Sequence, residues 1–221
     1  MPGVRLFITG TDTDIGKTVV TAALAASAPG VVCAAKPVAS GTTEGLPPDD
    51  ASRIARAAGH EPRCFVAMVP AVSPHRALLM QRERIQPTEL EAWIRGLAGD
   101  TVLVEGVGGW RVPIQVGHAP VFVHDLARWT DGRIVVVAGN RLGVLNHTQL
   151  TLEAIRADGF EVAGVVLNRL PGTSDESQDH NLEDLTALLD VPVTQFPVLD
   201  PNDDPALRQA GMDLWARLKL C

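Results

Sequence analysis

Short runs of apolar, mostly β-branched residues alternate along the chain with longer Ala- and Leu-rich stretches of helical period. The short runs predict strands at Leu6–Thr9, Val31–Ala35, Val102–Glu105, Ile134–Ala138, Val162–Asn168 and Val193–Phe196. The longer stretches predict helices at Lys17–Ala28, Asp50–Ala58, Thr88–Leu97, Asn146–Ala157 and Leu182–Leu189, with a shorter helix from Pro205. Several strands are apolar at successive positions, which is typical of strands covered on both faces. The pattern therefore predicts an α/β fold, with a mostly parallel β-sheet flanked by helices on both faces.

Size and composition narrow this picture to one globular domain. The chain has 221 residues, 46% of them hydrophobic and 20% charged. No linker, internal repeat or low-complexity tract interrupts the pattern, so we expect a single domain over residues 1–221, with Gly41–Asp49 as a flexible loop inside it. The net charge of −7 argues against a general nucleic-acid binder, so an anionic ligand must be held by local positive groups.

The cysteine pattern and the length of the apolar runs indicate in which cellular compartment the protein works. Cys33, Cys64 and Cys221 are odd in number and show no metal-ligand spacing, so neither a disulfide framework nor a zinc site is indicated. The N-terminus shows no signal-peptide pattern, and no apolar run approaches the roughly 18 residues that a membrane helix needs. We therefore expect a soluble cytoplasmic protein that acts without a membrane.

The first predicted strand leads into a loop that has the context of a nucleotide phosphate loop. The segment TGTDTDIGKT ends in Gly16-Lys17-Thr18 and opens a helical pattern. Its glycines let backbone N–H groups point at phosphates, Lys17 neutralises charge, and the Thr18 hydroxyl can bind Mg²⁺. A glycine-rich turn with a surface lysine is the simpler alternative. A dinucleotide-binding fold is excluded because no G-x-G-x-x-G follows the strand.

Two further charged residues follow predicted strands, at the edge where an open parallel sheet binds its ligands. Glu105 precedes the glycine-rich segment Gly106–Trp110, and its carboxylate can hold Mg²⁺ unless it merely caps a turn. Lys36 follows the second strand, and Pro37 keeps it out of a helical conformation. A lone lysine is usually a surface charge, but here Lys36 would face the same ligand as Lys17.

Several weaker candidates accompany these residues. One of Asp49 and Asp50 is expected to be the N-cap of the next helix, and Asp50 is the better second carboxylate for a metal because it directly precedes Ala51. Ser40 and the motif Ser73–His75 are equally compatible with ordinary turns.

A second anion site is predicted after the fourth strand. The helix that follows Arg141 and Gly143 offers free N–H groups and the positive end of its dipole, which suit a carboxylate. Asn146 could simply cap this helix, and the two interpretations are compatible.

In this order, the motifs resemble those of the dethiobiotin synthetase family. The resemblance runs from Phe7 to about Asn202 and includes the long spacing of the phosphate loop. It rests on TGTDTDIGKT at Thr9–Thr18, KPVASG at Lys36–Gly41, SPH at Ser73–His75, VEGVGGW at Val104–Trp110 and LGVLNHTQLT at Leu142–Thr151. It implies a P-loop NTPase fold and a homodimer that uses ATP and Mg²⁺. The implied reaction closes the ureido ring of 7,8-diaminopelargonate (7,8-diaminononanoate) with CO₂ to give dethiobiotin, ADP and phosphate, a step of biotin biosynthesis.

The resemblance also implies roles for individual residues. Lys17 and Lys36 would be the catalytic residues, acting on a carbamate and on the transferring phosphoryl group. The metal ligands would be Thr18, Asp50 and Glu105. The residues expected to bind the nucleotide are Asp14, Ile15, Gly16, Lys17, Thr18, Val19, Asp50, Glu105, Gly106, Val107, Gly108, Asn168, Pro197, Val198, Leu199 and Asn202. The residues expected to bind the diamine substrate are Ser40, Gly143, Val144 and Asn146, of which the last three would come from the neighbouring subunit.

Two departures from the family pattern concern the substrate carboxylate and the nucleotide base. The chain contains no tyrosine, whereas some family members use one near the substrate carboxylate, and Arg141 stands where a lysine is common. The stretch Arg169–Asp179 matches too loosely to carry any residue over.

Two other ATP-using classes remain as alternatives. An amidoligase of the cobyrinic acid diamide synthase type usually has a further glutaminase domain, for which 221 residues leave no room. A non-catalytic partitioning-type ATP switch carries a signature lysine where this chain has Thr11.

Overall fold

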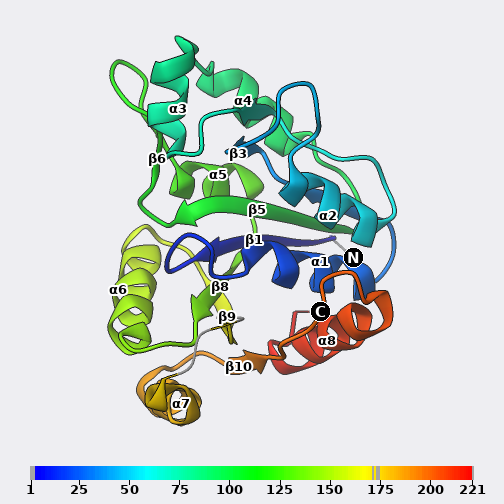
Figure 1. Cartoon of the computed structure of the whole chain (residues 1–221), viewed down its shortest axis with the longest axis vertical. Helices are drawn as coiled ribbons and strands as arrows, with labels where there is room; N and C mark the ends of the chain where they lie inside the picture. The colour runs from blue at the N-terminus through cyan, green and yellow to red at the C-terminus, as the bar shows by residue number, and fades with distance from the viewer. Residues whose placement is uncertain (1–2, 171, 173–174, 221) are drawn as a thin grey trace.

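The computed structural model describes residues 3–170, 172 and 175–220. Within them, one six-stranded sheet runs through the molecule in the order β10-β9-β8-β1-β5-β2, and every adjacent pair is parallel (Figure 1). Its strands are β1 (Val4–Gly10), β2 (Val32–Ala35), β5 (Thr101–Gly109), β8 (Arg133–Gly139), β9 (Val162–Asn168) and β10 (Val193–Phe196). The parallel sheet predicted from the apolar runs is confirmed.

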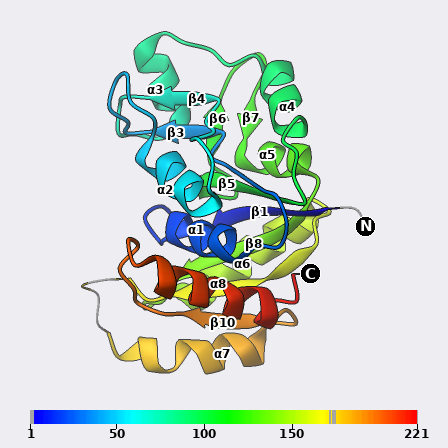
Figure 2. The same cartoon turned by 90° about the vertical axis from the view of Figure 1, so that its right-hand side faces the viewer.

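Helices cover both faces of this sheet. They are α1 (Lys17–Ser27), α2 (Asp49–Ala58), α3 (Pro74–Gln81), α4 (Pro87–Arg95), α5 (Val123–Thr130), α6 (Val144–Ala157), α7 (Asn181–Leu188) and α8 (Asp204–Arg217), with a 3₁₀ turn at Glu176–Asp179. Figure 2 shows α1 and α8 in front of the sheet, where they pack with α2 around Leu6 and Leu103. The neighbouring residues Phe7 and Val104 point to the other face and pack with α4, α5, α6 and α7. Burial on both faces explains the uninterrupted apolar runs.

The described part of the chain shows no helix that combines the length and apolar character needed to cross a bilayer. The two cysteines that it contains, Cys33 and Cys64, are both free, and Cys221 lies outside the described residues.

Two small sheets and two of the helices were not predicted. β3 (Val38–Ser40) pairs with β4 (Val66–Met68) in parallel, and β6 (Pro113–Gln115) pairs with β7 (Val121–Phe122) in antiparallel. Strands of two or three residues are too short to show a period of two. α3 and α5 have only eight residues each, which is little more than two helical turns. α3 starts directly after Ser73, where turn residues were one of the two interpretations.

Predictions for three helices were wrong: the N-cap of α2, the start of α6 and the length of α8. Neither Asp49 nor Asp50 is the N-cap of α2, because Pro48 holds that position and both aspartates lie in the first turn. α6 begins after Gly143, so Asn146 is its third residue rather than its cap. Gly143 has φ +94°, a left-handed conformation that glycine adopts without strain. The C-terminal helix is not short, since α8 and α6 both have 14 residues.

The position of Glu105 also differs from the prediction. β5 continues through the glycine segment as far as Gly109, which pairs with Gly10, so Glu105 lies inside the strand rather than at its end. The register of this pairing shifts between Ile8 and Gly10. Glycines permit such an irregularity because they have no side chain to clash with the neighbouring strand.

Candidate active site

The loop between β1 and α1 is held in a compact curl. Gly16 has φ +90°, and a Cβ at this position would collide with the side-chain amide of Asn168. Asp14 has φ +54°, a left-handed conformation that aspartate tolerates better than most residues. Asn168, at the end of β9, donates from Nδ2 to the carbonyl of Ile15 at 2.8 Å. The curl therefore depends on a neighbouring strand as well as on the loop's own residues.

Lys17 places a buried ammonium group in this loop. Its Nζ donates to the carbonyl of Asp12 at 2.9 Å, and its side chain is almost inaccessible. Burial, followed by the nearby charge of Lys36, lowers the pKa of Lys17 to about 8. A bound anion would therefore stabilise the protonated form of Lys17 and raise its pKa.

Lys36 is the centre of a buried cluster of charges. Its Nζ lies 2.6 Å from Oε1 of Glu105, 2.9 Å from the carbonyl oxygen of Gly106 and 3.2 Å from Oδ2 of Asp50. Burial pushes the pKa of Lys36 down, but the two carboxylates outweigh it and leave this pKa raised. Burial likewise pushes the pKa of Asp50 up, and Lys36 with the Thr18 hydrogen bond leaves it lowered. The oxygens of Glu105, Gly106 and Asp50 together give each of the three N–H bonds of the Lys36 ammonium an acceptor.

The same cluster offers oxygen ligands for a divalent cation. Oγ1 of Thr18 lies 2.9 Å from both Oδ1 of Asp50 and Oε1 of Glu105. Glu105 is 1% exposed, and its Oε2 is buried without a hydrogen-bond partner. An unsatisfied carboxylate oxygen beside a hydroxyl and a second carboxylate fits a hard cation such as Mg²⁺.

The protein alone would supply only part of the shell of such a cation. No group of three or more His, Cys, Asp or Glu side chains that could hold a metal occurs in the described ranges. Phosphate oxygens and waters would have to complete the coordination, as is usual for Mg²⁺ at nucleotide sites.

Two adjoining cavities open over these groups. The first, of about 380 Å³, is lined by the predicted residues Asp14, Ile15, Gly16, Lys17, Thr18, Lys36, Ser40, Asp50, Glu105, Val107 and Gly108. The second, of about 400 Å³, shares Thr13, Asp14, Ser40, Val107 and Gly108 with the first and extends to residues 71–74 at the start of α3. The arrangement suits a ligand that has a polyanionic group in one cavity and a further part in the other.

Comparison with known proteins identifies the family. A family model described as an AAA domain matches residues 4–201. An ATP-dependent dethiobiotin synthetase of Pseudomonas aeruginosa is 40% identical over 94% of this chain and 95% of its own length. One of Aeromonas salmonicida is 39% identical over 84% and 86%. The chain belongs to the ATP-dependent dethiobiotin synthetase family. Membership in this family of ligases agrees with the resemblance carried by the motifs.

Solved structures with the same fold come from a different functional class. A septum site-determining protein MinD of Pyrococcus horikoshii, complexed with Mg-ADP, superimposes with a TM-score of 0.53 at 16% identity, covering 98% of this chain and 94% of that one. A ParA family ATPase of Chlorobium tepidum gives 0.52 at 15% identity, covering 98% and 92%. Identities this low show the fold alone, which confirms the predicted P-loop NTPase type.

Seven of the residues predicted to bind the nucleotide line neither of the two cavities: Val19, Gly106, Asn168, Pro197, Val198, Leu199 and Asn202. Val19 is half-buried on α1 and packs against the apolar cluster on that face, and Leu199 packs against the same cluster. Pro197 and Val198 line another cavity, of about 510 Å³, between β10 and α8. Asn202 is exposed, and its backbone N–H donates to the carboxylate of Asp200 at 2.9 Å. Asn168 touches the phosphate loop directly, through its hydrogen bond to the carbonyl of Ile15.

The start of α6 does not join the two cavities of its own chain. Gly143 and Asn146 are exposed, Val144 is buried, and none of them lines either cavity. Arg141 does reach the phosphate loop, where its Nη2 lies 2.8 Å from Oδ2 of Asp12. The carboxylate site predicted at this helix is therefore separate, within one chain, from the phosphate site.

Some residues of the site were missed from the sequence. Ala39 lines the first cavity, Thr13 lines both, and Ala71, Val72 and Val112 line the second, beside Ser73 and Pro74 of the SPH motif. Thr13 and Ala39 belong to the motifs TGTDTDIGKT and KPVASG, but motif membership does not distinguish a lining residue from its neighbours, and Ala71, Val72 and Val112 lie outside every motif. The ion pair between Asp12 and Arg141 had no sequence signal.

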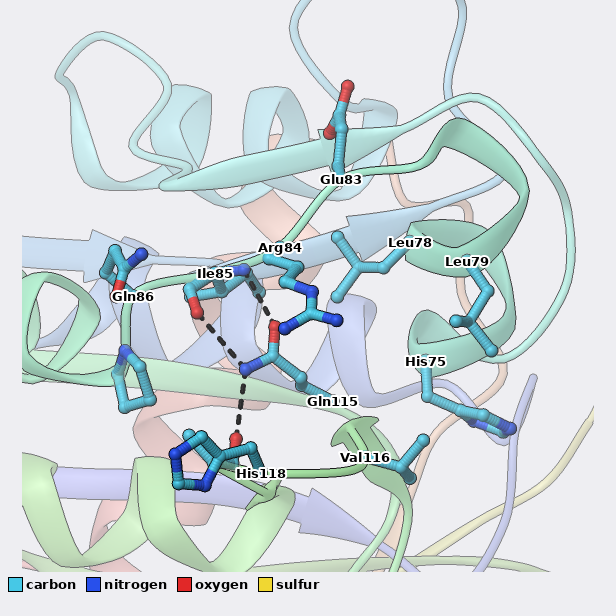
Figure 3. A pocket seen from close by; sticks show the side chains of 12 residues that line it. His75, Leu78, Leu79, Glu83, Arg84, Ile85, Gln86, Gln115, Val116 and His118 are labelled. Atoms are coloured by element: carbon cyan, nitrogen blue, oxygen red, sulfur yellow. Dashed lines mark hydrogen bonds between the residues drawn. The ribbon is translucent and has the colours of Figure 1, made fainter.

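A smaller cavity of about 220 Å³ lies away from this site, between α3, the connector to α4 and the β6–β7 hairpin (Figure 3). Gln115 joins the two segments around it. Its Oε1 accepts from the N–H of Ile85 at 2.8 Å, and its Nε2 donates to the carbonyls of Ile85 and Ala119 at 3.1 and 2.9 Å. No residue predicted to bind nucleotide or substrate lines this cavity, and the Gln115 contacts fasten the connector to the hairpin.

Proposed function

We propose that this chain is an ATP-dependent dethiobiotin synthase, which closes the ureido ring of 7,8-diaminopelargonate with CO₂ in biotin biosynthesis. The observation that carries this proposal is the convergence of Lys17, Lys36 and Glu105 on one phosphate-loop cavity that adjoins a second cavity, in a member of the family. The first cavity suits the nucleotide phosphates, and the second is suited to the diamine.

The reaction needs two bond-forming steps at carbon and one transfer of a phosphoryl group. One substrate amine adds to CO₂ and loses a proton to give a carbamate. A carbamate oxygen attacks the γ-phosphorus of ATP, and ADP leaves. The second amine attacks the carbamoyl carbon of this mixed anhydride, expels phosphate and closes the ring. The products are dethiobiotin, ADP and phosphate.

The chain's own residues act by position and charge rather than by covalent chemistry. The ammonium groups of Lys17 and Lys36 stabilise the negative charge that spreads over the transferring phosphoryl oxygens and the carbamate. Lys36 keeps its charge because Glu105 and Asp50 raise its pKa. Ser40 lines both cavities, which places it at the junction where the diamine and the phosphate would meet. Holding the reacting groups together there accounts for much of the rate enhancement.

Mg²⁺ fits the oxygen cluster of this site. Thr18, Asp50 and Glu105 would hold it together with phosphate oxygens and water. When bound, the ion neutralises charge on the phosphate oxygens.

We extend the proposal to a homodimer whose substrate sites lie at the interface. Two features support it: the exposed start of α6, and its separation from the cavities of the same chain. The start of α6, with Gly143, Val144 and Asn146, would receive the distal carboxylate of a diamine bound to the partner. The adenine would lie near Asn168 and the segment Pro197–Leu199.

In this function, residues 1–221 would form one catalytic domain that works in the cytoplasm. The free thiols of Cys33 and Cys64 support a reducing compartment.

Labelled bicarbonate tests the reaction directly. The protein is incubated with labelled bicarbonate, 7,8-diaminopelargonate and MgATP, and the reaction is stopped with acid to remove free carbamate and CO₂. We expect acid-stable label in a ring product whose mass matches dethiobiotin, with one ADP formed per ring. An absence of acid-stable label at saturating ATP and diamine would overturn the assignment.

A further inference from the structure

The glycine segment after Glu105 lines the active site but has little rigidity of its own. Gly106, Gly108 and Gly109 make up most of it, and glycine restricts the backbone less than any other residue. Nevertheless, the Gly106 carbonyl accepts a hydrogen bond from Lys36, and Gly108 lines both cavities. Gly109 pairs with Gly10 of β1, but the pairing is irregular between Glu105 and Gly109, so the position of the segment also depends on contacts outside the sheet.

The C-terminal end of this segment is anchored by Trp110. The indole is 3% exposed and makes edge contacts with the rings of Phe7 and Phe160, at centroid distances of 6.4 and 5.1 Å. Phe7 in turn lies against Gly106, where an added Cβ would come within 3.0 Å of its ring. The Phe7 ring therefore links the Trp110 indole to Gly106, whose carbonyl accepts a hydrogen bond from Lys36.

A carboxylate fixes the indole. Nε1 of Trp110 donates to Oδ2 of Asp158 at 2.7 Å, and a buried indole N–H needs such an acceptor. Arg111 binds the same carboxylate with two nitrogens, at 2.9 Å from Oδ2 and 3.2 Å from Oδ1. Asp158 is the C-cap of α6, so this contact joins the end of α6 to the end of β5, at the left in Figure 1.

We propose that Trp110 and Asp158 are positioning residues for the ring-closing reaction, because together they hold the glycine segment against Lys36 and the phosphate site. This inference rests on the proposed function for its kinetic consequences. Neither side chain lines the two cavities, so both act through the backbone of residues 106–109. The hydrogen bond from Trp110 to Asp158 holds the glycine segment in position, and the exposed Arg111 only helps to fix the Asp158 carboxylate.

Four single variants separate these contributions. Trp110→Phe keeps an aromatic ring but removes the N–H donor, and Asp158→Ala removes the acceptor. We expect each to lower kcat about 10- to 100-fold, the scale of a small misplacement at a reacting centre, with the Kd for MgATP unchanged within about twofold. Asp158→Asn keeps an oxygen for the indole and should restore most of kcat. Arg111→Ala is the matched control and should stay within about twofold of the wild type, because the Arg111 side chain is exposed and its removal leaves the indole hydrogen bond to Asp158 in place.

The kinetic readout distinguishes positioning from loss of folded protein. kcat is expressed per nucleotide-binding site, counted by MgATP titration, so that unfolded molecules do not contribute. The inference is overturned if Trp110→Phe and Asp158→Ala retain wild-type kcat per site, or if Asp158→Asn falls as far as Asp158→Ala.

A second measurement does not depend on turnover and keeps this inference separate from the proposed function. Hydrogen exchange is followed in peptides that cover Val104–Ile114 and, as a reference, the phosphate loop. Trp110→Phe should speed exchange in Val104–Ile114 and leave the phosphate loop unchanged. If wild-type protein makes no dethiobiotin, the proposed function fails and exchange decides the positioning role. Unchanged exchange in Val104–Ile114 would contradict it.

Discussion

The phosphate site and the start of α6 differ in how complete they are within one chain. At the phosphate site, Lys36 and Glu105 are buried and every N–H of the Lys36 ammonium has an acceptor in the same chain. Around the start of α6, Leu142 is 80% exposed and Leu150 is 57% exposed. One region is a buried charge network in which Oε2 of Glu105 still lacks a partner, and the other is a helix end with apolar side chains in solvent.

This difference indicates two kinds of function within one reaction. Because the charged groups of the phosphate site all come from one chain, the proposed binding and activation of ATP would need only a single subunit. The start of α6 lines neither cavity of its own chain, so in the proposed dimer it would act on the diamine bound to the partner subunit. Substitutions in the first region should therefore affect chemistry, and those in the second should affect binding of the diamine.

Removing the charge at the centre of the network has the largest expected effect. Lys36→Ala should lower kcat by about 10²- to 10³-fold, the usual consequence of losing a group that stabilises developing negative charge. The Kd for MgATP should change by less than about threefold, because the phosphate loop and Lys17 remain. Stopped assays of dethiobiotin and calorimetry with MgATP measure the two quantities. Lys219→Ala, at an exposed lysine, is the control and should match the wild type.

Stability must be followed in the same variant. Lys36→Ala leaves Glu105 and Asp50 without their cation, which typically costs about 3–5 kcal/mol for a buried pair. Activity is therefore expressed per MgATP-binding site. Loss of MgATP affinity in parallel with kcat would show instead that Lys36 holds the nucleotide.

A substitution at the start of α6 should give the next largest effect. Asn146→Asp adds a negative charge near the expected position of the substrate carboxylate, and we expect the KM for the diamine to rise about tenfold, equivalent to about 1.4 kcal/mol. An acidic residue in the first helical turn favours the helix, so the melting temperature should not fall. Steady-state kinetics with varied diamine measure this change. An unchanged KM would remove α6 from the substrate site.

The lowered pKa of Lys17 predicts a pH dependence of nucleotide binding. In the free protein Lys17 loses its proton above about pH 8, and bound phosphate favours the protonated form. Binding of MgATP at pH 9 should therefore take up a proton, and affinity should fall as the pH rises through 8. Calorimetry in two buffers with different ionisation enthalpies measures the uptake. Lys17→Met should abolish it, and equal uptake in both proteins would place the titrating group elsewhere.

The ion pair between the two regions should have the smallest effect. Asp12 and Arg141 are both about half exposed, and exposed pairs contribute about 0.2–1 kcal/mol. Arg141→Ala should therefore change the Kd for MgATP by less than about fivefold. Titrations at low and high salt provide the check. A larger change that persists at high salt would mean that Arg141 contacts a ligand.

Several parts of the site could be predicted because their chemistry is local. Lys17 and Thr18 follow a strand and open a helix, a context that only a few functions share. Lys36 and Glu105 were expected together because parallel strands bring their carboxyl ends to one edge of the sheet. The structure places these residues in one cavity, as that argument requires.

Other parts depend on contacts between distant segments and could not be predicted. Asp12 meets Arg141 across 129 residues of sequence, and Trp110 meets Asp158 across 48. The charge of Asp12 in a phosphate loop is balanced by that distant arginine. Asp14 occupies a left-handed position for which its side chain is suited. β3 and β4 have three residues each, too few for a period to be recognised.

Complementation between subunits tests the central claim most directly, namely that one subunit's phosphate site works with the partner's α6. Lys36→Ala and Asn146→Asp chains are co-expressed with different tags, and the mixed dimer is purified and assayed at a diamine concentration well below KM. In a twofold-symmetric dimer, one of its sites combines both defects and the other has neither, so we predict about half of the wild-type activity. Activity no higher than the mean of the two single-variant dimers would show that each chain builds its site alone.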